Sequence, residues 1–310
     1  FLNYAIKQLT IQKKSSKIAS SSKKERNREM KKFLCMILAV LTAACAMGMA
    51  ACGGNGNTLI VYTEAGFAPF EYIKDSKIVG ADVDIMNLVG EELGMSVQFE
   101  NVAFDQIVDT VSAGKLAKVG AAGISITDER KEKVAFSVPY YTANLYVIYQ
   151  VTDAATYEST TTDDVTGVYW DAFADKKIGV QSGTTADLFL GDETAEGGVL
   201  DGKNVTKTGY DALSTAVADI GLNIDVVIID ELPAKQLIKD NSKLKCAPLY
   251  YQGADGEADE AAVDEYAICV TKGETEILNA INKVLNALLA ETDENGNNGV
   301  EQLVMEHLGV

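Results

Sequence analysis

Residues 119–141 read VGAAGISITDERKEKVAFSVPYY, a small-residue strand followed by a polar turn, a basic helix and an aromatic exit. Gly123 leaves the main chain open to close approach, and Ser125 offers a hydroxyl. Thr127 is placed to cap a helix that carries Arg130 in its first turn. A helix start and a guanidinium together suit a bound carboxylate or phosphate, although a capped surface helix with a solvated Arg130 fits this stretch equally well.

Outside this stretch, short apolar strands alternate with amphipathic helices from Thr58 onward. This alternation predicts an α/β architecture in which sheets are flanked by helices. The 310 residues, 47% of them hydrophobic, are enough for one large or two moderate domains. Two similar α/β series are separated by hinge-like segments, and a final strand and helix can return to the first series.

The individual elements follow from the apolar periodicity and the turn residues. We expect strands at 59–63, 96–102, 116–123, 144–151, 177–180, 204–210, 225–229, 245–249 and 266–271, and helices at 82–93, 104–111, 211–220, 232–239, 274–290 and 300–308. Two further helices are expected, one that begins after Thr127 and one that follows the turn at 181–185 and runs to Leu190. Residues 153–175 are polar and poorly periodic, which favours an insertion or linker. Residues 252–264 are acidic and rich in Gly and Ala, which favours a loop.

The N-terminal region has the layout of a secretory signal. Residues 30–51 contain a short basic segment, an apolar run and the small residues that precede Cys52. The apolar run is short for a membrane span, so a transmembrane anchor is the less favoured alternative. We expect residues 1–29 to be an upstream extension that is not part of the native protein, and residues 52–57 to be a flexible linker.

The charge balance and the scarce metal-binding side chains exclude several classes of function. From Cys52 onward the chain has 17 basic and 43 acidic residues, a net charge of −26, which argues against binding nucleic acid or lying on an anionic membrane. With a single His307 and no cysteine cluster, neither a zinc site nor a Ser-His-Asp triad can be assembled, and no cofactor is expected. For Cys246 and Cys269, two buried free thiols are favoured over a disulfide.

Five motifs in order resemble the solute-binding proteins of polar amino-acid ABC importers, which have the type II periplasmic-binding fold. The motifs are TEAGFAPFEY, VGADVDIM, GISITDERKEKVAFSVPYY, KIGVQSGTTAD and VVIIDELPA. The resemblance implies two lobes, each a mixed and mostly parallel sheet flanked by helices, joined by a two-segment hinge. Residues 58–142 would form lobe 1, residues 146–253 lobe 2, and residues 266–310 the return to lobe 1.

The resemblance also implies that one amino acid binds between the lobes. Arg130 would bind its α-carboxylate, helped by the backbone of Gly123 and the hydroxyl of Ser125. Thr184 and Thr185 would approach the same group from lobe 2. Asp230, at the carboxyl end of its strand, would bind the α-ammonium, so that both charges of the zwitterion are paired.

Three further residues match positions that contact the ligand's side chain in this family. Phe67 and Phe104 would sandwich its aliphatic stem, with ordinary core packing as the alternative. Glu64 would face its far end and would favour a cationic or amide side chain over an acidic one, because two facing carboxylates repel. An exposed strand-end acid is the alternative for Glu64. Ala186, where many members have a polar residue, departs from the pattern and leaves side-chain specificity open.

The implied function is that of a receptor that binds one amino acid, with polar or basic ones favoured, and delivers it to the permease subunits of an ABC importer. The Met-Ala-Ala-Cys sequence resembles a bacterial lipobox, so lipid on Cys52 would hold a monomer at the outer face of the cytoplasmic membrane. Catalysis is not expected. The alternatives are an enzyme on the same fold, similar to cyclohexadienyl dehydratase, and a ligand-sensing protein with a separate signalling partner.

Overall fold

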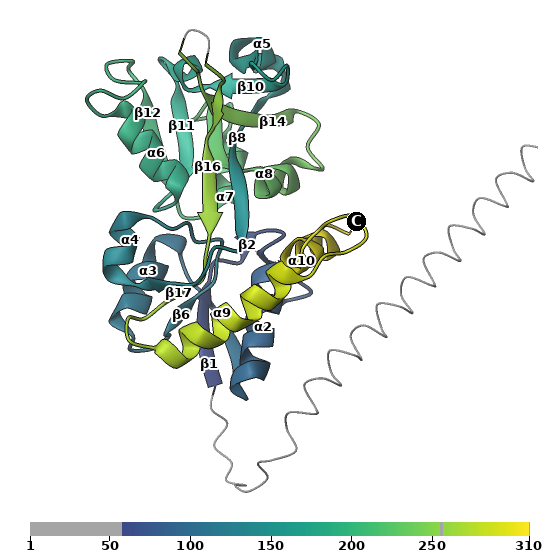
Figure 1. Cartoon of the computed structure of the whole chain (residues 1–310). Helices are drawn as coiled ribbons and strands as arrows, with labels where there is room; N and C mark the ends of the chain where they lie inside the picture. Colours follow the sequence, from purple (N-terminus) through teal and green to yellow (C-terminus); the bar gives the residue numbers. More distant parts are fainter. Residues whose placement is uncertain (1–57, 255–256, 310) are drawn as a thin grey trace, which may run out of the picture. The chain divides into compact units, whose positions relative to one another are not determined.

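A computed structural model describes residues 58–254 and 257–309 of the chain. The predictions for residues 1–29, the signal at 30–51, the linker at 52–57 and Cys52 lie outside the described residues. Two mixed sheets dominate the described part, and a small three-stranded sheet accompanies the first of them (Figure 1). Within 58–254 and 257–309, no helix is long and apolar enough to cross a bilayer.

The first sheet has the strand order β5-β1-β6-β17-β7. The long strands β1 and β5 pair in parallel over six residues, whereas β17 pairs antiparallel with β6 and β7. A separate hairpin sheet, β2-β3-β4, follows β1 in the chain. The strands are β1 (Thr58–Thr63), β2 (Gly66–Phe67), β3 (Glu71–Lys74), β4 (Lys77–Val79), β5 (Ser96–Asn101), β6 (Val119–Gly120), β7 (Ala135–Phe136) and β17 (Cys269–Val270).

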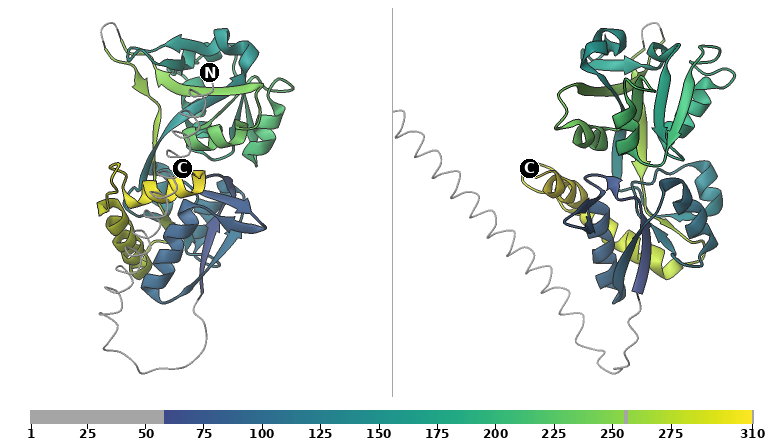
Figure 2. Two further views of the ribbon diagram at one scale, coloured as in Figure 1. Left: turned by 90° about the vertical axis from the view of Figure 1, so that its right-hand side faces the viewer. Right: turned by 180° about the vertical axis from the view of Figure 1, so that it is seen from behind.

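Helices cover both faces of the first sheet, because successive side chains of a strand point to opposite sides. Val61 and Val119 belong to the core beneath α2, α9 and α10, whereas Tyr62 and Cys269 pack with α3 on the other face. Figure 2 shows the two C-terminal helices beside α2, although they end the chain. The helices are α2 (Ala81–Leu93), α3 (Phe104–Ala113), α4 (Asp128–Lys133), α9 (Thr275–Ala290) and α10 (Gly299–Leu308).

The second sheet has the order β12-β11-β13-β8-β14-β10-β9, with β15 on β14 and β16 on β8. Its strands are β8 (Tyr141–Gln150), β9 (Glu158–Thr160), β10 (Thr166–Tyr169), β11 (Lys177–Gln181), β12 (Thr206–Tyr210), β13 (Val226–Asp230), β14 (Leu244–Tyr251), β15 (Glu260–Ala261) and β16 (Val263–Tyr266). Its helices are η1 (Val151–Asp153), α5 (Ala154–Tyr157), η2 (Trp170–Phe173), α6 (Thr185–Thr194), α7 (Leu213–Asp219) and α8 (Glu231–Ile238).

Two segments connect the first sheet with the second. The chain enters the second sheet through β8 and leaves it through β16, and these two strands pair antiparallel from Val263 opposite Asn144 to Tyr266 opposite Tyr141. Tyr140, just before β8, donates its backbone N–H to the Tyr266 carbonyl at 2.9 Å. The crossing is therefore a hydrogen-bonded ribbon of two strands, as Figure 1 shows between the two sheets.

Two predictions of loop structure were wrong. Residues 153–175 are not a linker, because they supply β9, β10 and η2 to the second sheet, and Trp170 is buried there at 1% exposure. The acidic stretch 252–264 contains β15 and the start of β16. The hairpin at 66–79 was not predicted, and β6 and β17 are much shorter than the strands expected at 116–123 and 266–271.

Cys246 and Cys269 are both free thiols, as favoured from the sequence. Cys269 is fully buried, and Cys246 is only partly buried. Burial in apolar surroundings raises the pKa of the Cys269 thiol to about 12, so this thiol stays protonated and unreactive at neutral pH.

Candidate functional site

Residues that follow or end four strands gather where the first and second sheets face each other. Glu64 follows β1, the 121–127 loop follows β6, Gln181 ends β11, and Asp230 ends β13. The carboxyl ends of strands in open α/β sheets are the usual place for a ligand. The two sheets thus direct backbone amides, hydroxyls and carboxylates into the same region.

Arg130 is the buried cation of this region, with 7% of its surface exposed. Its helix begins as predicted, because the Thr127 hydroxyl accepts the Arg130 N–H at 3.2 Å. The guanidinium donates to the Ser125 carbonyl at 2.6 Å and to the Gly183 carbonyl at 2.7 Å, and it lies over the Phe104 ring at 5.6 Å. Arg130 therefore joins the 121–127 loop to the turn that precedes α6, and the reading of a solvated surface arginine is wrong.

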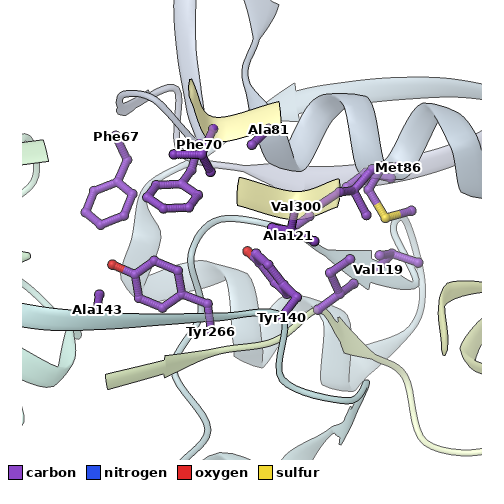
Figure 3. Packing of buried hydrophobic residues seen from close by; sticks show 14 of the residues in the cluster. Phe67, Phe70, Ala81, Met86, Val119, Ala121, Tyr140, Ala143, Tyr266 and Val300 are labelled. Carbon is purple, nitrogen blue, oxygen red and sulfur yellow. The ribbon is translucent and has the colours of Figure 1, made fainter. Parts of the chain in front are cut away.

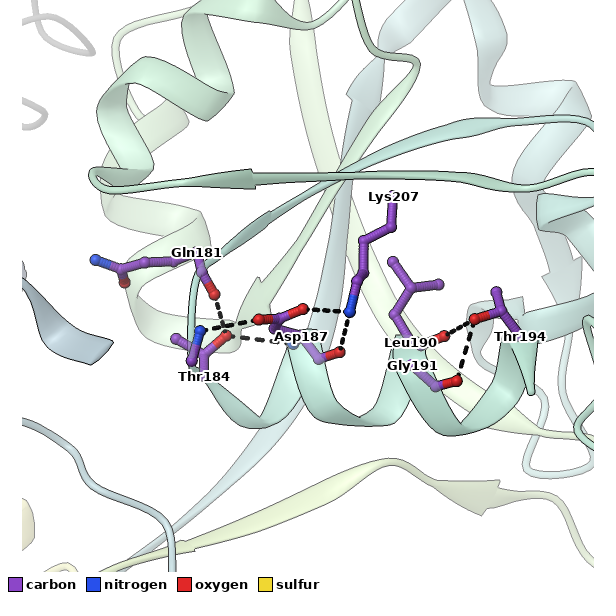
Figure 4. Close-up of polar contacts among 8 residues, drawn as sticks. Gln181, Thr184, Asp187, Leu190, Gly191, Thr194 and Lys207 are labelled. Atoms are coloured by element: carbon purple, nitrogen blue, oxygen red, sulfur yellow. Dashed lines mark hydrogen bonds and ion pairs between the residues drawn. The ribbon is translucent and has the colours of Figure 1, made fainter. Parts of the chain in front are cut away.

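Hydroxyl groups from the two sheets meet beside Arg130. The Ser125 and Thr185 hydroxyl oxygens are 3.3 Å apart, and both residues are buried. Thr184 caps α6: its hydroxyl donates to the Gln181 carbonyl and accepts the Asp187 N–H, while Asp187 pairs with Lys207 (Figure 4). The Thr184 hydroxyl is therefore engaged in the cap, and Thr185 is the α6 residue whose hydroxyl faces Ser125.

Asp230 lies at the end of β13 with 8% exposure, and its Oδ1 is buried without a hydrogen-bond partner in the described chain. Burial is the main reason that its pKa is raised to about 8, and the nearby Asp264 carboxylate adds to the shift. The Tyr266 hydroxyl offsets part of this shift, although the two side chains do not meet hydrogen-bond geometry. A donor or a cation placed between them would satisfy both groups.

Asp264 is a site residue that the sequence analysis missed. It lies on β16 with 6% exposure, accepts a hydrogen bond from the Thr185 hydroxyl, and has Ser125 and Arg130 as neighbours. Burial raises its pKa to about 6 in spite of these stabilising neighbours. The clue in the sequence is the alternation Val-Asp-Glu-Tyr, in which Asp264 and Tyr266 must share one face of a strand.

Glu64 faces the second sheet near the end of β11. Burial raises its pKa, and the Gln181 side chain and the Gly66 amide partly offset that effect. Gln181 is 2% exposed and donates through Nε2 to the Asp211 carbonyl at 3.1 Å. Glu64 is thus a partly buried acid near both sheets, and the reading of an exposed strand-end acid is wrong.

Aromatic rings form one wall of the region. Phe67 packs against Phe70 and Tyr266 with ring centroids 5.9 and 6.1 Å apart, and Figure 3 shows these rings beside Tyr140. Gly123 lies against this wall at φ 53°, and a Cβ on it would come within 2.8 Å of the Phe67 ring. Phe104 instead lies under the Arg130 guanidinium. The two predicted aromatics therefore have different neighbours.

All nine predicted binding residues lie in this region or support it, and Gln181, Asp264 and Tyr266 join them. The buried charges are unequal: Arg130 is the buried cation with Asp264 as its neighbour, whereas Asp230 and Asp264 are buried acids and Glu64 is a partly buried one. Such a site can pair an anionic group with Arg130 and one or more cationic groups with the acids. Within 58–254 and 257–309, no three His, Cys, Asp or Glu side chains are arranged to hold a metal ion.

The chain is similar to proteins of known family and structure. The profile of the bacterial extracellular solute-binding proteins, family 3, matches residues 59–294. The arginine-binding extracellular protein ArtP of Bacillus subtilis (strain 168) is 28% identical over 276 residues, which is 86% of this chain and 94% of ArtP.

Solved structures show the same fold. The amino acid ABC transporter substrate-binding protein AbpA from Streptococcus pneumoniae, bound to L-arginine, is 28% identical with a TM-score of 0.66, and the match covers 82% of this chain and 95% of AbpA. An ancestral arginine-binding protein bound to arginine is 26% identical with a TM-score of 0.65, covering 82% and 99% of the two chains. The fold is therefore of the type II periplasmic-binding kind, and this chain belongs to the bacterial extracellular solute-binding proteins, family 3.

Proposed function

We propose that the protein is an extracytoplasmic receptor for an amino acid with a cationic side chain, such as arginine or lysine. In this proposal Arg130 binds the ligand's α-carboxylate with the hydroxyls of Ser125 and Thr185. Gly123 and Thr184 shape the same end of the site, because the Gly123 N–H is donated to Asp82 and the Thr184 hydroxyl belongs to the α6 cap. Asp230 binds the α-ammonium. The two sheets and their helices form two lobes that close on the ligand about β8 and β16.

The observation that carries the proposal is the surplus of buried acid over buried base. Asp230 and Asp264 are nine-tenths or more buried, Glu64 is partly buried, and Arg130 is the buried cation among them. An amino acid with a neutral side chain has no net charge and cannot compensate this excess of acidic groups. Arginine or lysine has a net charge of one positive unit and can compensate part of it. An acidic amino acid would add a carboxylate to a region where burial already raises the pKa of each acid.

Glu64 and Asp264 have separate parts in this proposal. Glu64 faces the far end of the ligand's side chain, with Phe67 and Phe104 along its aliphatic stem. Asp264 supplies a second negative charge beside Asp230 and anchors the Thr185 hydroxyl. ArtP and AbpA, the one named for arginine binding and the other solved with L-arginine, support a cationic ligand.

A thermal-shift panel tests this proposal on the purified protein. We expect L-arginine and L-lysine to raise the melting temperature most, L-glutamine and L-histidine less, and L-glutamate not at all. A ligand at 100 times its dissociation constant adds about 2.7 kcal/mol to the free energy of unfolding. No shift with any amino acid would overturn the receptor proposal, and a larger shift with L-glutamate than with L-arginine would overturn the cationic preference. Conversion of a ligand during the titration would instead favour the enzyme alternative.

The proposal includes a lipid anchor on Cys52 and delivery to the permease subunits of an ABC importer. The support is the lipobox-like sequence before Cys52 and the two relatives named for amino-acid binding outside the cell or in an ABC transporter. We expect Cys52→Ser to move the protein from the membrane fraction to the medium or periplasm, because one lipid modification is lost. Cys246→Ser is the matched control and should stay in the membrane fraction. Unchanged membrane recovery of the Cys52→Ser protein would contradict the anchor.

A further inference from the structure

Two buried carboxyl groups, those of Glu71 and Asp82, belong to neighbouring segments beside the 121–127 loop: the Asp82 N–H donates to the carbonyl of Phe70, the residue before Glu71, at 3.0 Å, and the two carboxyl groups interact electrostatically. Glu71, at the start of β3, is 0% exposed, and Asp82, in the first turn of α2, is 1% exposed. Neither forms an ion pair with a basic residue among the described residues. Neither was among the predicted binding residues, although each lies within a sequence motif quoted above. Two adjacent buried carboxyl groups cannot both be ionised without a large cost.

Asp82 contacts two parts of the binding region at once. Its Oδ2 accepts the Gly123 backbone N–H at 3.0 Å, and its Oδ1 accepts the Tyr140 hydroxyl at 2.6 Å. Gly123 belongs to the 121–127 loop, and Tyr140 stands at the start of the crossing into β8. The start of the 13-residue helix α2 also favours a negative charge on Asp82.

Glu71 has the opposite environment. Both of its carboxyl oxygens are buried, and no N–H or hydroxyl of the described chain donates to either of them. The charged groups that face it are all acids, namely Asp82, Glu64 and Asp230. A protonated Glu71 removes this repulsion and can donate its own O–H to Asp82, so that one of its two buried oxygens gains a hydrogen-bond partner within the pair.

We propose that Glu71 and Asp82 share one proton and act as a positioning pair, whose single negative charge fixes the Gly123 amide and the Tyr140 hydroxyl for ligand binding. This inference rests on the proposed function, since it assigns the pair to the support of the same site. The pair acts on the ligand through Gly123 and Tyr140 and does not contact it. In the pair, Glu71 is a neutral carboxylic acid that donates a hydrogen bond, and Asp82 is a carboxylate that accepts it.

The geometry shows why this support matters. Gly123 has φ 53°, and a Cβ added to it would come within 2.8 Å of the Phe67 ring, so this position of the loop requires a glycine and packs closely on the aromatic wall. Tyr140 is hydrogen-bonded through its backbone to Tyr266 on the other crossing segment. The Asp82 carboxylate thus links α2, the 121–127 loop and both crossing segments. Because Glu71 is protonated, Asp82 carries the single negative charge of the pair.

Burial is the main cause of the pKa shifts in the pair. It raises the pKa of Glu71 well above its usual range and that of Asp82 to about 6, while the Tyr140 hydroxyl and the Gly123 amide favour the charged form of Asp82. Tyr140, whose pKa is also raised by burial and by the Asp82 charge, stays a donor. The pair should therefore carry one charge at neutral pH and lose it as the pH falls through about 6.

The first test measures binding of L-arginine to Asp82→Asn by calorimetry at neutral pH. We expect the dissociation constant to rise at least about tenfold, because an amide cannot accept from both Gly123 and Tyr140 with the strength of a carboxylate. Glu91→Gln, an exposed acid of the same helix, is the matched control and should bind like the wild type. Wild-type affinity in a folded Asp82→Asn protein would overturn the proposal.

The second test needs no ligand and reads the shared proton directly. Infrared difference spectra at about pH 7.5 should show a protonated carboxylic acid that Glu71→Gln removes. The comparison is made in an Asp230→Asn background, because Asp230 also carries a proton near that pH. An unchanged carboxylic acid band would overturn the shared proton even if Asp82→Asn failed to fold. If the wild type does not bind L-arginine but the band behaves as expected, the proposed ligand is wrong and the pair stands.

Discussion

Arg130→Ala is expected to abolish measurable binding of amino acids. The guanidinium is the buried cation that the proposed site offers to the ligand's α-carboxylate, and its two donors now hold the Ser125 and Gly183 carbonyls. A hydrogen bond to a charged group contributes about 1.5–3 kcal/mol, so loss of a two-pronged contact corresponds to roughly 3–6 kcal/mol. The dissociation constant should rise at least about 100-fold, as measured by calorimetry with L-arginine.

The controls for this prediction separate charge from geometry. Lys131→Ala removes an exposed cation from the same helix and should leave affinity unchanged. Arg130→Lys keeps the charge but loses the planar fork, and should bind more tightly than Arg130→Ala and more weakly than the wild type. If a folded Arg130→Ala protein bound L-arginine as the wild type does, the carboxylate site would have to lie elsewhere.

Affinity for L-arginine should rise with pH between about pH 6 and pH 8, because Asp230 must lose its proton to pair with an ammonium group. In the protein without ligand, the pKa of the Asp230 carboxyl is raised to about 8. A cation bound beside this carboxyl would lower its pKa. Binding below about pH 8 therefore releases a proton. The dissociation constant should fall by at most about tenfold for each pH unit in this window. Calorimetry in two buffers of different ionisation enthalpy would count the proton directly.

Asp230→Asn is the control for the pH prediction. Its affinity should be weak and nearly independent of pH between about pH 7 and pH 8, because an amide neither titrates nor carries charge. Closer to pH 6 the Asp82 and Asp264 carboxyls, whose pKa values are raised to about 6, begin to protonate in both proteins. The gap between wild type and variant should be widest near pH 8 and should close toward pH 6, where the wild-type side chain is itself neutral. Equal slopes for the two proteins would assign the pH dependence to another group, such as Asp264.

The two α/β series could be predicted from the sequence because apolar residues recur along their strands and helices at the spacing typical of each element. The long strands β1, β5 and β11 and the helices α2, α9 and α10 lie within one or two residues of the predicted ranges. Thr127 and Arg130 were identifiable from the pattern alone, because one sits at a helix cap and the other in a first turn, whereas the role predicted for Asp230, at a strand end, came from the family resemblance.

Asp264 could not be found in the same way because its strand inverts the usual pattern. In β16 the apolar Val263 is 50% exposed while Asp264 faces inward, so a search for buried apolar alternation rejects the segment. The strands within 153–175 were missed for a related reason. Their order depends on pairing with β14, which is distant in sequence. Partly buried Glu64 likewise acquires its environment from Gln181, a residue of the other sheet.

The strand β17 lies between β6 and β7, although it comes near the end of the chain. A chain made or exported from its N-terminus therefore lacks an interior strand of the first sheet until residue 270 is available, whereas the strands of the second sheet are complete by residue 266. The second sheet thus has all of its strands available slightly before the first sheet does. The 121–127 loop, supported by β6, would acquire its final position only after β17 joins. Competence to hold a ligand would then appear late in biogenesis, once nearly the whole chain has emerged.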